Sequence, residues 1–427
     1  MDGLRSIGGS KRMFNTIEQF IEYTTGRMSS GRFGLSGLRD ALDQIDNPHL
    51  KLRTVHIAGT NGKGSTTNFL RSVLQTAGYK TGSFTSPHLE VHNDRIRIDD
   101  TFISDQDLLR YGNRFYDIIE SNRLTMFEID MLIASAYFAD NNVDVALYEV
   151  GLGGRLDATN LITPMLSLIT NIGMDHMEYL GDTLSAIAGE KAGIIKPGVP
   201  LITGETKQEC VEVFREVCQN NHSRMHFTQS AKLLLSEPDT VTFAYRGFTI
   251  RLKGPALYQI QNASLAIEAL IMLREAEKYV ISDTDITEGL NKAVWKGRFE
   301  VVHRNPTIVL DGAHNEHGVQ AILSSIQSLP KPVIAVFTAL RDKKAKGMIE
   351  NLLTVCDKII VTEFAFYRGA KAEDLASGLP VEIITDPMEA LRYGYGLAKS
   401  GSLLITGSLY FISDVRKTYL PQLLERE

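Results

Sequence analysis

Short apolar runs of β character alternate with helical patterns along most of this chain. The first run covers residues 54–58 and leads into a helical pattern that extends to about Gly78. A second helical pattern, over residues 127–140, predicts an amphipathic helix. Because the strand-like runs are continuously apolar, this order predicts a mostly parallel sheet covered by helices, with further strands at residues 143–150, 166–171 and 200–204.

The second half of the chain breaks this pattern and then resumes it. Residues 232–252 alternate polar and apolar positions between turns, which predicts a small antiparallel appendage, and residues 262–279 predict a helix. A new alternation begins after Gly297, with strands expected at residues 307–310, 333–337, 358–362, 381–384 and 402–406. We therefore predict an α/β protein with an N-terminal domain over residues 1–296 and a second, smaller Rossmann-like α/β domain over residues 297–427.

Length and composition agree with this division and exclude some classes of protein. A chain of 427 residues is too long for one compact core. The net charge of −6, from 45 basic and 51 acidic residues, argues against a nucleic-acid partner but allows a local basic pocket. Three cysteines are too few for a disulfide framework, and no apolar run resembles a signal peptide or a membrane span. We expect a cytoplasmic protein without a membrane partner.

The first predicted strand leads into a glycine-rich turn with the chemistry of a phosphate-binding loop. Glycines allow backbone N–H groups to face an anion, and the following helix N-terminus adds unpaired donors. A lysine in this turn can reach the outer phosphates of a nucleotide. The sequence therefore predicts a P-loop-type N-terminal domain, with the phosphate-binding residues Gly59, Thr60, Asn61, Gly62, Lys63, Gly64 and Ser65.

This loop departs from the standard P-loop pattern at two positions. The pattern requires glycine where this chain has Ile57, and Ser or Thr directly after the lysine, where this chain has Gly64. The hydroxyl that usually binds magnesium is thus displaced to Ser65 or absent. The alternative interpretation is an ordinary glycine-rich turn between a strand and a helix.

Polar residues follow other predicted strands, at the edge where open α/β sheets bind ligands. Ser86 lies in a loop before Pro87, where a plain turn is the alternative. Glu149 ends an apolar strand, where a carboxylate is costly unless it is paired or binds a metal, and three glycines follow it. This is the position of a magnesium-binding Walker-B acid. His176 follows Asp175 after another buried strand, which we expect to lie beside the strand of Glu149. The two neighbouring acidic residues favour a metal or phosphate role for His176 over a structural one.

Two further groups are candidates for chemistry. Lys191 falls on the apolar stripe of a helix that starts near Asp182, and a buried lysine needs a salt bridge, a shifted pKa or a covalent modification. In the second domain, Asp311 and His314 follow a predicted strand at a helix N-terminus. Arg298 lies at the domain joint, where its guanidinium reaches a phosphate or forms an inter-domain ion pair.

Taken together, these motifs resemble the folylpolyglutamate synthase/dihydrofolate synthase family within the Mur-type ATP-dependent amide ligases. The resemblance runs nearly from end to end of the chain. It rests on Phe33-Gly34-Leu35, Asn47-Pro48-His49, Gly59 to Ser65, Thr85 to His88, Glu149 to Asn160, Asp175-His176, Glu190 to Gly193, Gln259 with Asn262-Ala263, Trp295 to Arg298, Asp311 to Asn315, Asp342-Lys343 and Thr406-Gly407-Ser408.

The resemblance implies a role for each matching residue. Gly62, Lys63 and Gly64 hold the ATP phosphates, while Asn262 and Arg298 match ATP-contacting positions. Asp311 and His314 match nucleotide and glutamate-side positions. The implied magnesium ligands are Ser86, Glu149 and His176, and Lys191 matches the family's carbamylated lysine, which organises a second magnesium. Lys63, Lys191, His176 and Arg298 are thus the implied catalytic residues.

The implied reaction is ATP-dependent addition of L-glutamate to a folate or dihydropteroate carboxylate through an acyl phosphate. The resemblance also implies ATP, Mg²⁺ at two sites, a monovalent cation and a monomer. The chain departs from the family pattern at Tyr258, Thr338, Lys344 and Gly369. Two alternatives are another Mur-type ligase acting on a cell-wall nucleotide precursor, for which an additional N-terminal domain is expected, and a P-loop nucleotide switch without ligase activity.

Overall fold

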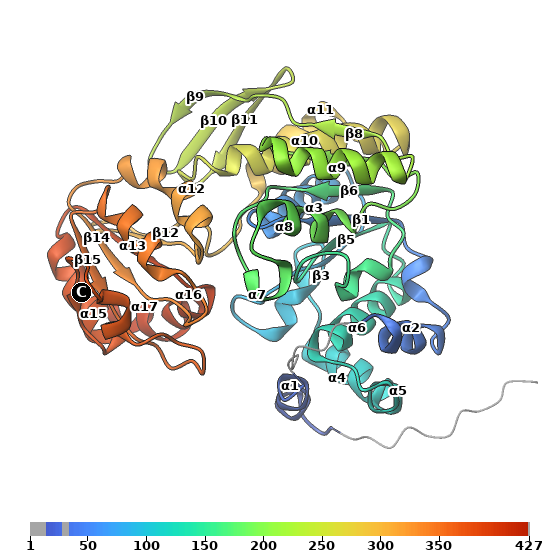
Figure 1. Ribbon diagram of the computed structural model, residues 1–427, viewed down its shortest axis with the longest axis horizontal. Helices are drawn as coiled ribbons and strands as arrows, with labels where there is room; N and C mark the ends of the chain where they lie inside the picture. The colour runs from blue at the N-terminus through green and yellow to red at the C-terminus, as the bar shows by residue number, and fades with distance from the viewer. Residues whose placement is uncertain (1–13, 28–33, 426–427) are drawn as a thin grey trace, which may run out of the picture.

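The computed structural model describes residues 14–27 and 34–425, which form two α/β bodies side by side (Figure 1). Phe33, one of the residues on which the family resemblance rests, lies outside this range. The α-helices are α1 Ile17–Thr25, α2 Ser36–Asp43, α3 Lys63–Thr76, α4 Asp105–Arg114, α5 Tyr116–Asn122, α6 Met126–Asp140, α7 Met177–Leu180, α8 Leu184–Ala192, α9 Gln208–Asn220, α10 Gln259–Ala276, α11 Asp283–Lys292, α12 Glu316–Gln327, α13 Ala345–Leu353, α14 Ala372–Ala376, α15 Pro387–Ala398, α16 Leu409–Asp414 and α17 Leu420–Leu424.

The N-terminal domain is built on an eight-stranded sheet in the order β4-β3-β2-β5-β1-β6-β7-β8. The strands from β2 to β8 in this order are parallel, and the edge strands β3 and β4 are antiparallel. The mostly parallel sheet expected from the apolar runs is therefore confirmed. Its strands are β1 Thr54–Ala58, β2 Thr81–Phe84, β3 Ile96–Ile98, β4 Thr101–Phe102, β5 Val145–Glu149, β6 Leu166–Ile169, β7 Leu201–Thr203 and β8 Met225–Phe227.

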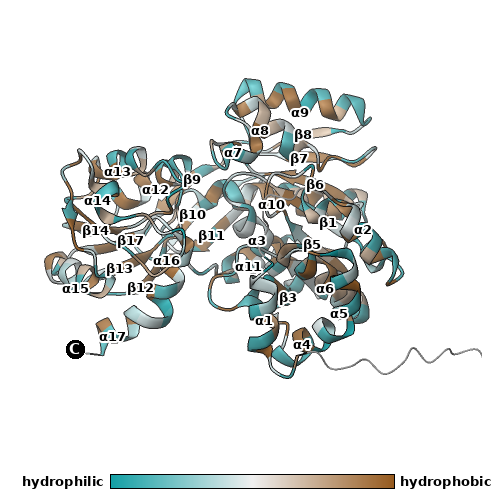
Figure 2. Cartoon of the chain, turned by 60° about the horizontal axis from the view of Figure 1, so that its bottom comes forward, coloured by the Kyte–Doolittle hydropathy of each residue, from teal (hydrophilic) through white to brown (hydrophobic). Residues whose placement is uncertain are grey.

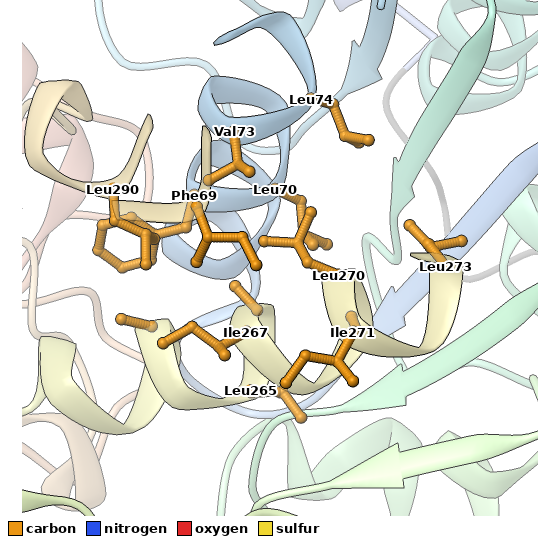
Figure 3. Packing of buried hydrophobic residues seen from close by; sticks show 14 of the residues in the cluster. Phe69, Leu70, Val73, Leu74, Leu265, Ile267, Leu270, Ile271, Leu273 and Leu290 are labelled. Carbon is orange, nitrogen blue, oxygen red and sulfur yellow. The ribbon is translucent and has the colours of Figure 1, made fainter. Parts of the chain in front are cut away.

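A three-stranded antiparallel sheet covers one side of this domain, at the top of Figure 1. It confirms the appendage predicted from the alternating polar pattern. Between it and the large sheet lies an apolar core into which α3, α10 and α11 contribute leucines, isoleucines, valine and phenylalanine (Figure 3). This core holds α3, which begins at the lysine of the phosphate loop, rigidly against the sheet. The strands of the appendage are β9 Lys232–Ser236, β10 Thr240–Tyr245 and β11 Phe248–Lys253.

Helix α6 differs from the amphipathic helix that the sequence predicts. Every residue from Ile129 to Phe138 is buried, because α6 lies between strands β2 and β3 and the outer helices α1, α2 and α4. A helix covered on all sides has no polar face. In contrast, α9 lies at the surface and shows alternating hydrophilic and hydrophobic segments (Figure 2). The predicted helix over residues 262–279 also begins earlier, at Gln259, and ends earlier, at Ala276.

The C-terminal domain is a six-stranded sheet in the order β12-β13-β17-β14-β15-β16. All neighbours are parallel except β12, an edge strand that the sequence analysis missed. Helices α12 and α13 pack on one face, and α15, α16 and α17 pack on the other. None of the described helices is long and apolar enough to cross a membrane. The strands are β12 Glu300–His303, β13 Thr307–Leu310, β14 Val333–Phe337, β15 Lys358–Val361, β16 Glu382–Ile383 and β17 Ser402–Thr406.

Candidate active site

Four neighbouring parallel strands end at one edge of the large sheet and bring their loops together. In the order β2-β5-β1-β6, Phe84 pairs with Tyr148, Ile57 with Glu149, and Ala58 with Ile169. The ends of these strands and the loops after them carry the phosphate loop, Ser86, Glu149 and His176, which line a common cavity. The same cavity is also lined by the other predicted site residues, which come from elsewhere in the chain: Lys191, Asn262, Arg298, Asp311 and His314. One expectation is wrong in detail: β1 lies between β5 and β6, so the strands of Glu149 and His176 are not neighbours. The loops converge because both strands flank the phosphate loop.

The glycines of the phosphate loop are required by close contacts. Gly62 has a φ of 87°, and a Cβ there would lie 2.2 Å from Asn262 Oδ1. At Gly64, a Cβ would lie 3.1 Å from Trp295 and 3.3 Å from Glu149 Oε2. Gly64 occupies the position of the usual P-loop hydroxyl residue, so its small size lets an acidic side chain approach the helix start instead.

The hydroxyl of Ser65 is engaged within the protein. Ser65 is buried, and its Oγ accepts a hydrogen bond of 3.1 Å from Gln259 Nε2. Gln259 in turn accepts a bond of 2.9 Å from the Asn262 amide. These contacts link the start of α3 to the start of α10. Asn262 and Ser65 both line the cavity, as the resemblance implies.

The Lys63 ammonium lies over the loop. Its Nζ donates to the carbonyls of Gly59 at 3.0 Å and Thr60 at 3.3 Å. Burial lowers the pKa of Lys63, while the nearby carboxylates of Glu149 and Asp175 act in the opposite direction. The side chain is therefore held where an anion in the cavity would replace these carbonyls as its partner.

The three implied metal ligands come from three different loops. The Ser86 backbone N–H donates to Glu149 Oε2 at 3.3 Å. Burial raises the pKa of Glu149 to about 7 and lowers that of His176 to about 4. At neutral pH the His176 ring is thus the neutral, metal-binding form. Hydroxyl, carboxylate and imidazole donors fit a divalent cation, whose charge would offset the cost of burying Glu149.

Within the described part of the chain, no three His, Cys, Asp or Glu side chains gather around one metal position. The implied set contains only one glutamate and one histidine, with a serine as the third member.

Lys191 is buried on helix α8, as its apolar stripe predicts. The helix begins after Thr183, whose hydroxyl accepts a hydrogen bond from the Ala186 N–H. Only 4% of Lys191 is exposed, and it forms no ion pair with any described residue. Its neighbour Glu190 pairs with Arg155 instead, at 2.8 Å. The sequence allowed a salt bridge as the partner of Lys191, and the described residues form none with it.

The environment of Lys191 disfavours a positive charge. Burial, together with repulsion from the nearby Lys63, lowers its pKa to about 7. Two lysine side chains thus approach the same cavity. An anionic ligand, or a change in the charge of one lysine, would balance this arrangement.

Asp311 and Arg298 occupy the joint between the domains. The Asp311 carboxylate accepts hydrogen bonds from the backbone of Phe299 at 2.7 Å and of Ala313 at 2.8 Å, and from the Tyr258 hydroxyl at 3.1 Å. Arg298 forms no ion pair with the residues that the structure describes, so the inter-domain pair is not observed. Its guanidinium lines the cavity.

His314 lies beside this joint on the C-terminal domain. Its Nδ1 donates to the Gly312 carbonyl at 2.8 Å, and burial lowers its pKa to about 4. The other ring nitrogen, Nε2, lies 3.7 Å from Asp175 Oδ2. His314 is therefore a neutral ring at the boundary between the two domains, and it lines the cavity.

Contacts between the domains were not predicted. The Asn315 amide donates to Asp175 Oδ2 at 2.8 Å and to Asn61 Oδ1 at 3.1 Å. Lys343 lies 2.6 Å from Asp175, and both side chains are more than nine-tenths buried. Burial alone would raise the pKa of Asp175, but His314, His176 and Lys343 hold it below its usual value. Asp342-Lys343 and Asn315 belong to the motifs that carry the family resemblance. No local pattern in the sequence, however, indicated that Lys343 and Asn315 contact Asp175.

A second cavity of about 540 Å³ lies next to the first one. Ser86, His176 and Leu409 line both, so the two cavities adjoin each other. The wall of the second cavity is largely apolar and comes from both domains. Asp157 also lines it, but its carboxylate accepts hydrogen bonds from the backbone of Gly151 and Leu152 and so shapes the glycine loop.

Comparison with known proteins places these features in a family. The chain matches the Mur ligase middle domain over residues 57–270 and the Mur ligase glutamate ligase domain over residues 297–409. The dihydrofolate synthase/folylpolyglutamate synthase of Bacillus subtilis is 38% identical over 95% of this chain and 99% of its own.

Solved structures of this family resemble the chain over nearly its whole length. E. coli FolC in complex with DHPP and ADP matches with a TM-score of 0.85 and 29% identity, covering 95% of this chain and 98% of that one. A bifunctional folylpolyglutamate synthase/dihydrofolate synthase with Mn, AMPPNP and L-glutamate bound matches with a TM-score of 0.83 and 28% identity. This match covers 95% of this chain and 98% of that one.

These matches span both sheets and agree with the loop chemistry, so the fold and site define a Mur-type ATP-dependent amide ligase. Within this class, the chain belongs to the folylpolyglutamate synthase/dihydrofolate synthase family. It is an ATP-dependent ligase that joins an acid to an amino acid.

Proposed function

We propose that the enzyme activates the carboxylate of a folate or dihydropteroate by phosphoryl transfer from ATP and then joins it to L-glutamate. The observation that carries this proposal is that the two cavities adjoin each other and share part of their walls. A loop suited to phosphates lies in the first, and a larger, mostly apolar space lies beside it. An acid held in the second cavity presents its carboxylate to the phosphate loop.

The residues of the first cavity have distinct parts in this scheme. The backbone N–H groups of residues 59–65 bind the phosphates, and Lys63 exchanges its loop carbonyls for phosphate oxygens. Arg298 approaches from the domain joint and stabilises charge during phosphoryl transfer. Asn262, Asp311 and His314 form the nucleotide-side and glutamate-side surfaces. The carboxylate of the acid substrate accepts the γ-phosphoryl group of ATP, which releases ADP and gives an acyl phosphate. The amino group of L-glutamate then attacks the acyl carbon, and phosphate leaves as the amide bond forms.

Ser86, Glu149 and His176 would hold a divalent metal, Mg²⁺ in this proposal, beside the phosphates. When bound, the metal neutralises charge on the phosphate oxygens. The chain itself prepares for it: the Ser86 N–H orients Glu149, and burial keeps the His176 ring neutral. Glu149 would be held as a carboxylate, because a cation at this position lowers its pKa.

We assign Lys191 as a carbamate that helps to hold a second Mg²⁺. Carbamylation requires the neutral amine as a nucleophile toward carbon dioxide, and burial lowers the pKa of Lys191 enough to supply it near pH 7. The modification would also change the repulsion between Lys63 and Lys191 into an attraction. The monovalent cation, the monomeric state and the cytoplasmic location remain predictions from the sequence.

An ADP-release assay with L-glutamate, with dihydropteroate and tetrahydrofolate compared side by side, tests this function. We expect ADP release that requires both the acid and glutamate, and the preferred acid identifies the reaction. ATP turnover that is independent of glutamate would support the nucleotide switch instead. Turnover only with a cell-wall nucleotide precursor would support the other Mur-type ligase.

A further inference from the structure

The C-terminal domain carries a stack of aromatic rings beside the second cavity. The ring of Phe366 is stacked between Tyr410, at a centroid distance of 4.4 Å and 21° between planes, and Phe364, at 5.6 Å and 4°. The Tyr367 ring follows at 4.8 Å from Phe366. The Arg368 guanidinium lies 5.8 Å from the centre of Phe366 and 5.5 Å from that of Tyr367. Four rings and a cation therefore form one array.

The backbone of this array is fixed from the loop after β14. Arg341 donates from Nε to the Gly369 carbonyl at 2.9 Å and from Nη2 to the Tyr367 carbonyl at 3.0 Å. The Arg341 backbone N–H also donates to the Arg368 carbonyl at 2.9 Å. At Gly369, a Cβ would lie 3.1 Å from the Phe364 carbonyl, so a larger residue would crowd the turn. The backbone of the aromatic segment is thus anchored by three hydrogen bonds, although it lies in a loop.

Tyr367 is the exposed end of this fixed array. It is 62% exposed, whereas Phe364, at the other end, is 7% exposed. Tyr367, Arg368 and Tyr410 line the second cavity, to which the N-terminal domain contributes Phe127. The Tyr367 ring lies at the cavity wall against Phe366 and Arg368, with most of its surface open. Contact with a flat apolar group would bury this surface, which is favourable in free energy.

We propose that Tyr367 is a specificity-determining residue that stacks on the aromatic ring system of the acid substrate. The substrate class is a planar aromatic carboxylic acid, whose rings lie in the second cavity while its carboxylate reaches the phosphate loop. This inference rests on the proposed function and deepens it by naming a contact to the acid. Phe366 and Arg368 act as positioning residues, because they touch Tyr367 and set the plane of its ring.

The experiment compares Michaelis constants for dihydropteroate, ATP and L-glutamate in the wild type, Tyr367→Ala and Tyr367→Phe. Tyr393→Ala is the matched control, because Tyr393 is another exposed tyrosine of this domain that does not line the cavity. Thermal unfolding checks that all four proteins are equally folded. The exposure of Tyr367 means that its removal leaves the core intact.

We expect Tyr367→Ala to raise the KM for dihydropteroate about ten-fold, with kcat and the other two constants within about two-fold of the wild type. Tyr367→Phe retains the ring and should behave like the wild type, as should Tyr393→Ala. An unchanged dihydropteroate KM in Tyr367→Ala would overturn the inference, and so would a rise confined to the glutamate KM or shared by all three substrates. A wild type without acid-dependent ADP release would instead refute the proposed function, on which the inference rests.

Discussion

Replacement of Lys191 by methionine should stabilise the protein while abolishing its activity. Lys191 is 4% exposed, and burial lowers its pKa from 10.5 to about 7. A shift of this size corresponds to at most about 5 kcal/mol of destabilisation, at about 1.4 kcal/mol per pH unit. With the effective dielectric response of real proteins, we expect a net gain of about 1–3 kcal/mol from the methionine, which keeps the length of the side chain.

The dependence on pH follows from the direction of this shift. Lys191 is a base whose pKa is lower in the folded protein, so the unfolded chain binds more protons between about pH 7 and pH 10.5. Wild-type stability should therefore rise with pH through this window, and the penalty should be complete below it. The advantage of Lys191→Met should shrink over the same range. Carbamylation removes the titrating amine, so bicarbonate should flatten the wild-type curve.

Calorimetric unfolding in carbon dioxide-free buffer at about pH 7 and about pH 9, repeated with bicarbonate, measures these effects. A gain of about 1–3 kcal/mol should appear as a rise of roughly 2–12 °C in the transition of the N-terminal domain. Lys253→Met is the control, because Lys253 is exposed on β11. A Lys191→Met protein that unfolds at a lower temperature than the wild type at pH 7 would refute the reasoning, as would full ligase activity in this variant.

Four further outcomes are expected. Lys63→Ala should abolish glutamate-dependent ADP release while leaving the fold intact, as circular dichroism would show, and near-normal turnover would contradict the phosphate assignment. Lys191→Ala should lose activity and regain part of it with acetate, a carboxylate that fits the vacated space; full activity without acetate would exclude the carbamate. Gly62→Ala should lower thermal stability by about 1–2 kcal/mol or more, because its φ of 87° is strained for alanine; an unchanged melting temperature would show that the loop relaxes. Lys343→Met should cost about 3 kcal/mol in denaturant unfolding at neutral pH, because it leaves Asp175 buried without its closest cation. Because the pKa of Asp175 is lowered in the folded protein, the stability that its carboxylate contributes is present above its unfolded pKa and is lost in acid. The unfolding free energies of the variant and the wild type should therefore converge at low pH. A difference that stays constant across pH would contradict this.

The parallel strands β1, β5, β6 and β7 of the large sheet and β13 to β17 of the second sheet were predictable because their signal is local. A run such as Thr54–Ala58 is mostly apolar, and its length and the glycine-rich turn after it mark a buried parallel strand. Strands β2, β3, β4 and β8 were not predicted, because they are two to four residues long and carry no continuous apolar run. Helix α6 was assigned correctly but its surroundings were not, since the same apolar residues suit a helix with one buried face or a helix buried on all sides. The edge strand β12 was missed because its four half-buried residues carry no continuous apolar run.

The candidate site was predictable to the extent that it follows the ends of strands. Glu149 ends an apolar run, His176 comes after another, and Ser86 follows the short strand β2; parallel strands place such residues at one edge of the sheet. Their assigned roles remain predictions, as does the domain boundary at residue 297. The contacts of Asn315 and Lys343 with Asp175 had no local signal, because they join residues 140 and 168 positions apart in the chain.

The sequence by itself thus determined the α/β class, the shortened phosphate loop, the burial of Lys191 and the family. These properties depend on the order and spacing of residues within short segments. The tertiary structure decided which loops face each other: it placed β1 between β5 and β6, joined the domains through Asp175, and set the ring of Tyr367 at the wall of the second cavity. Such contacts depend on how distant surfaces pack, and the local pattern of hydrophobic and polar residues does not encode that packing.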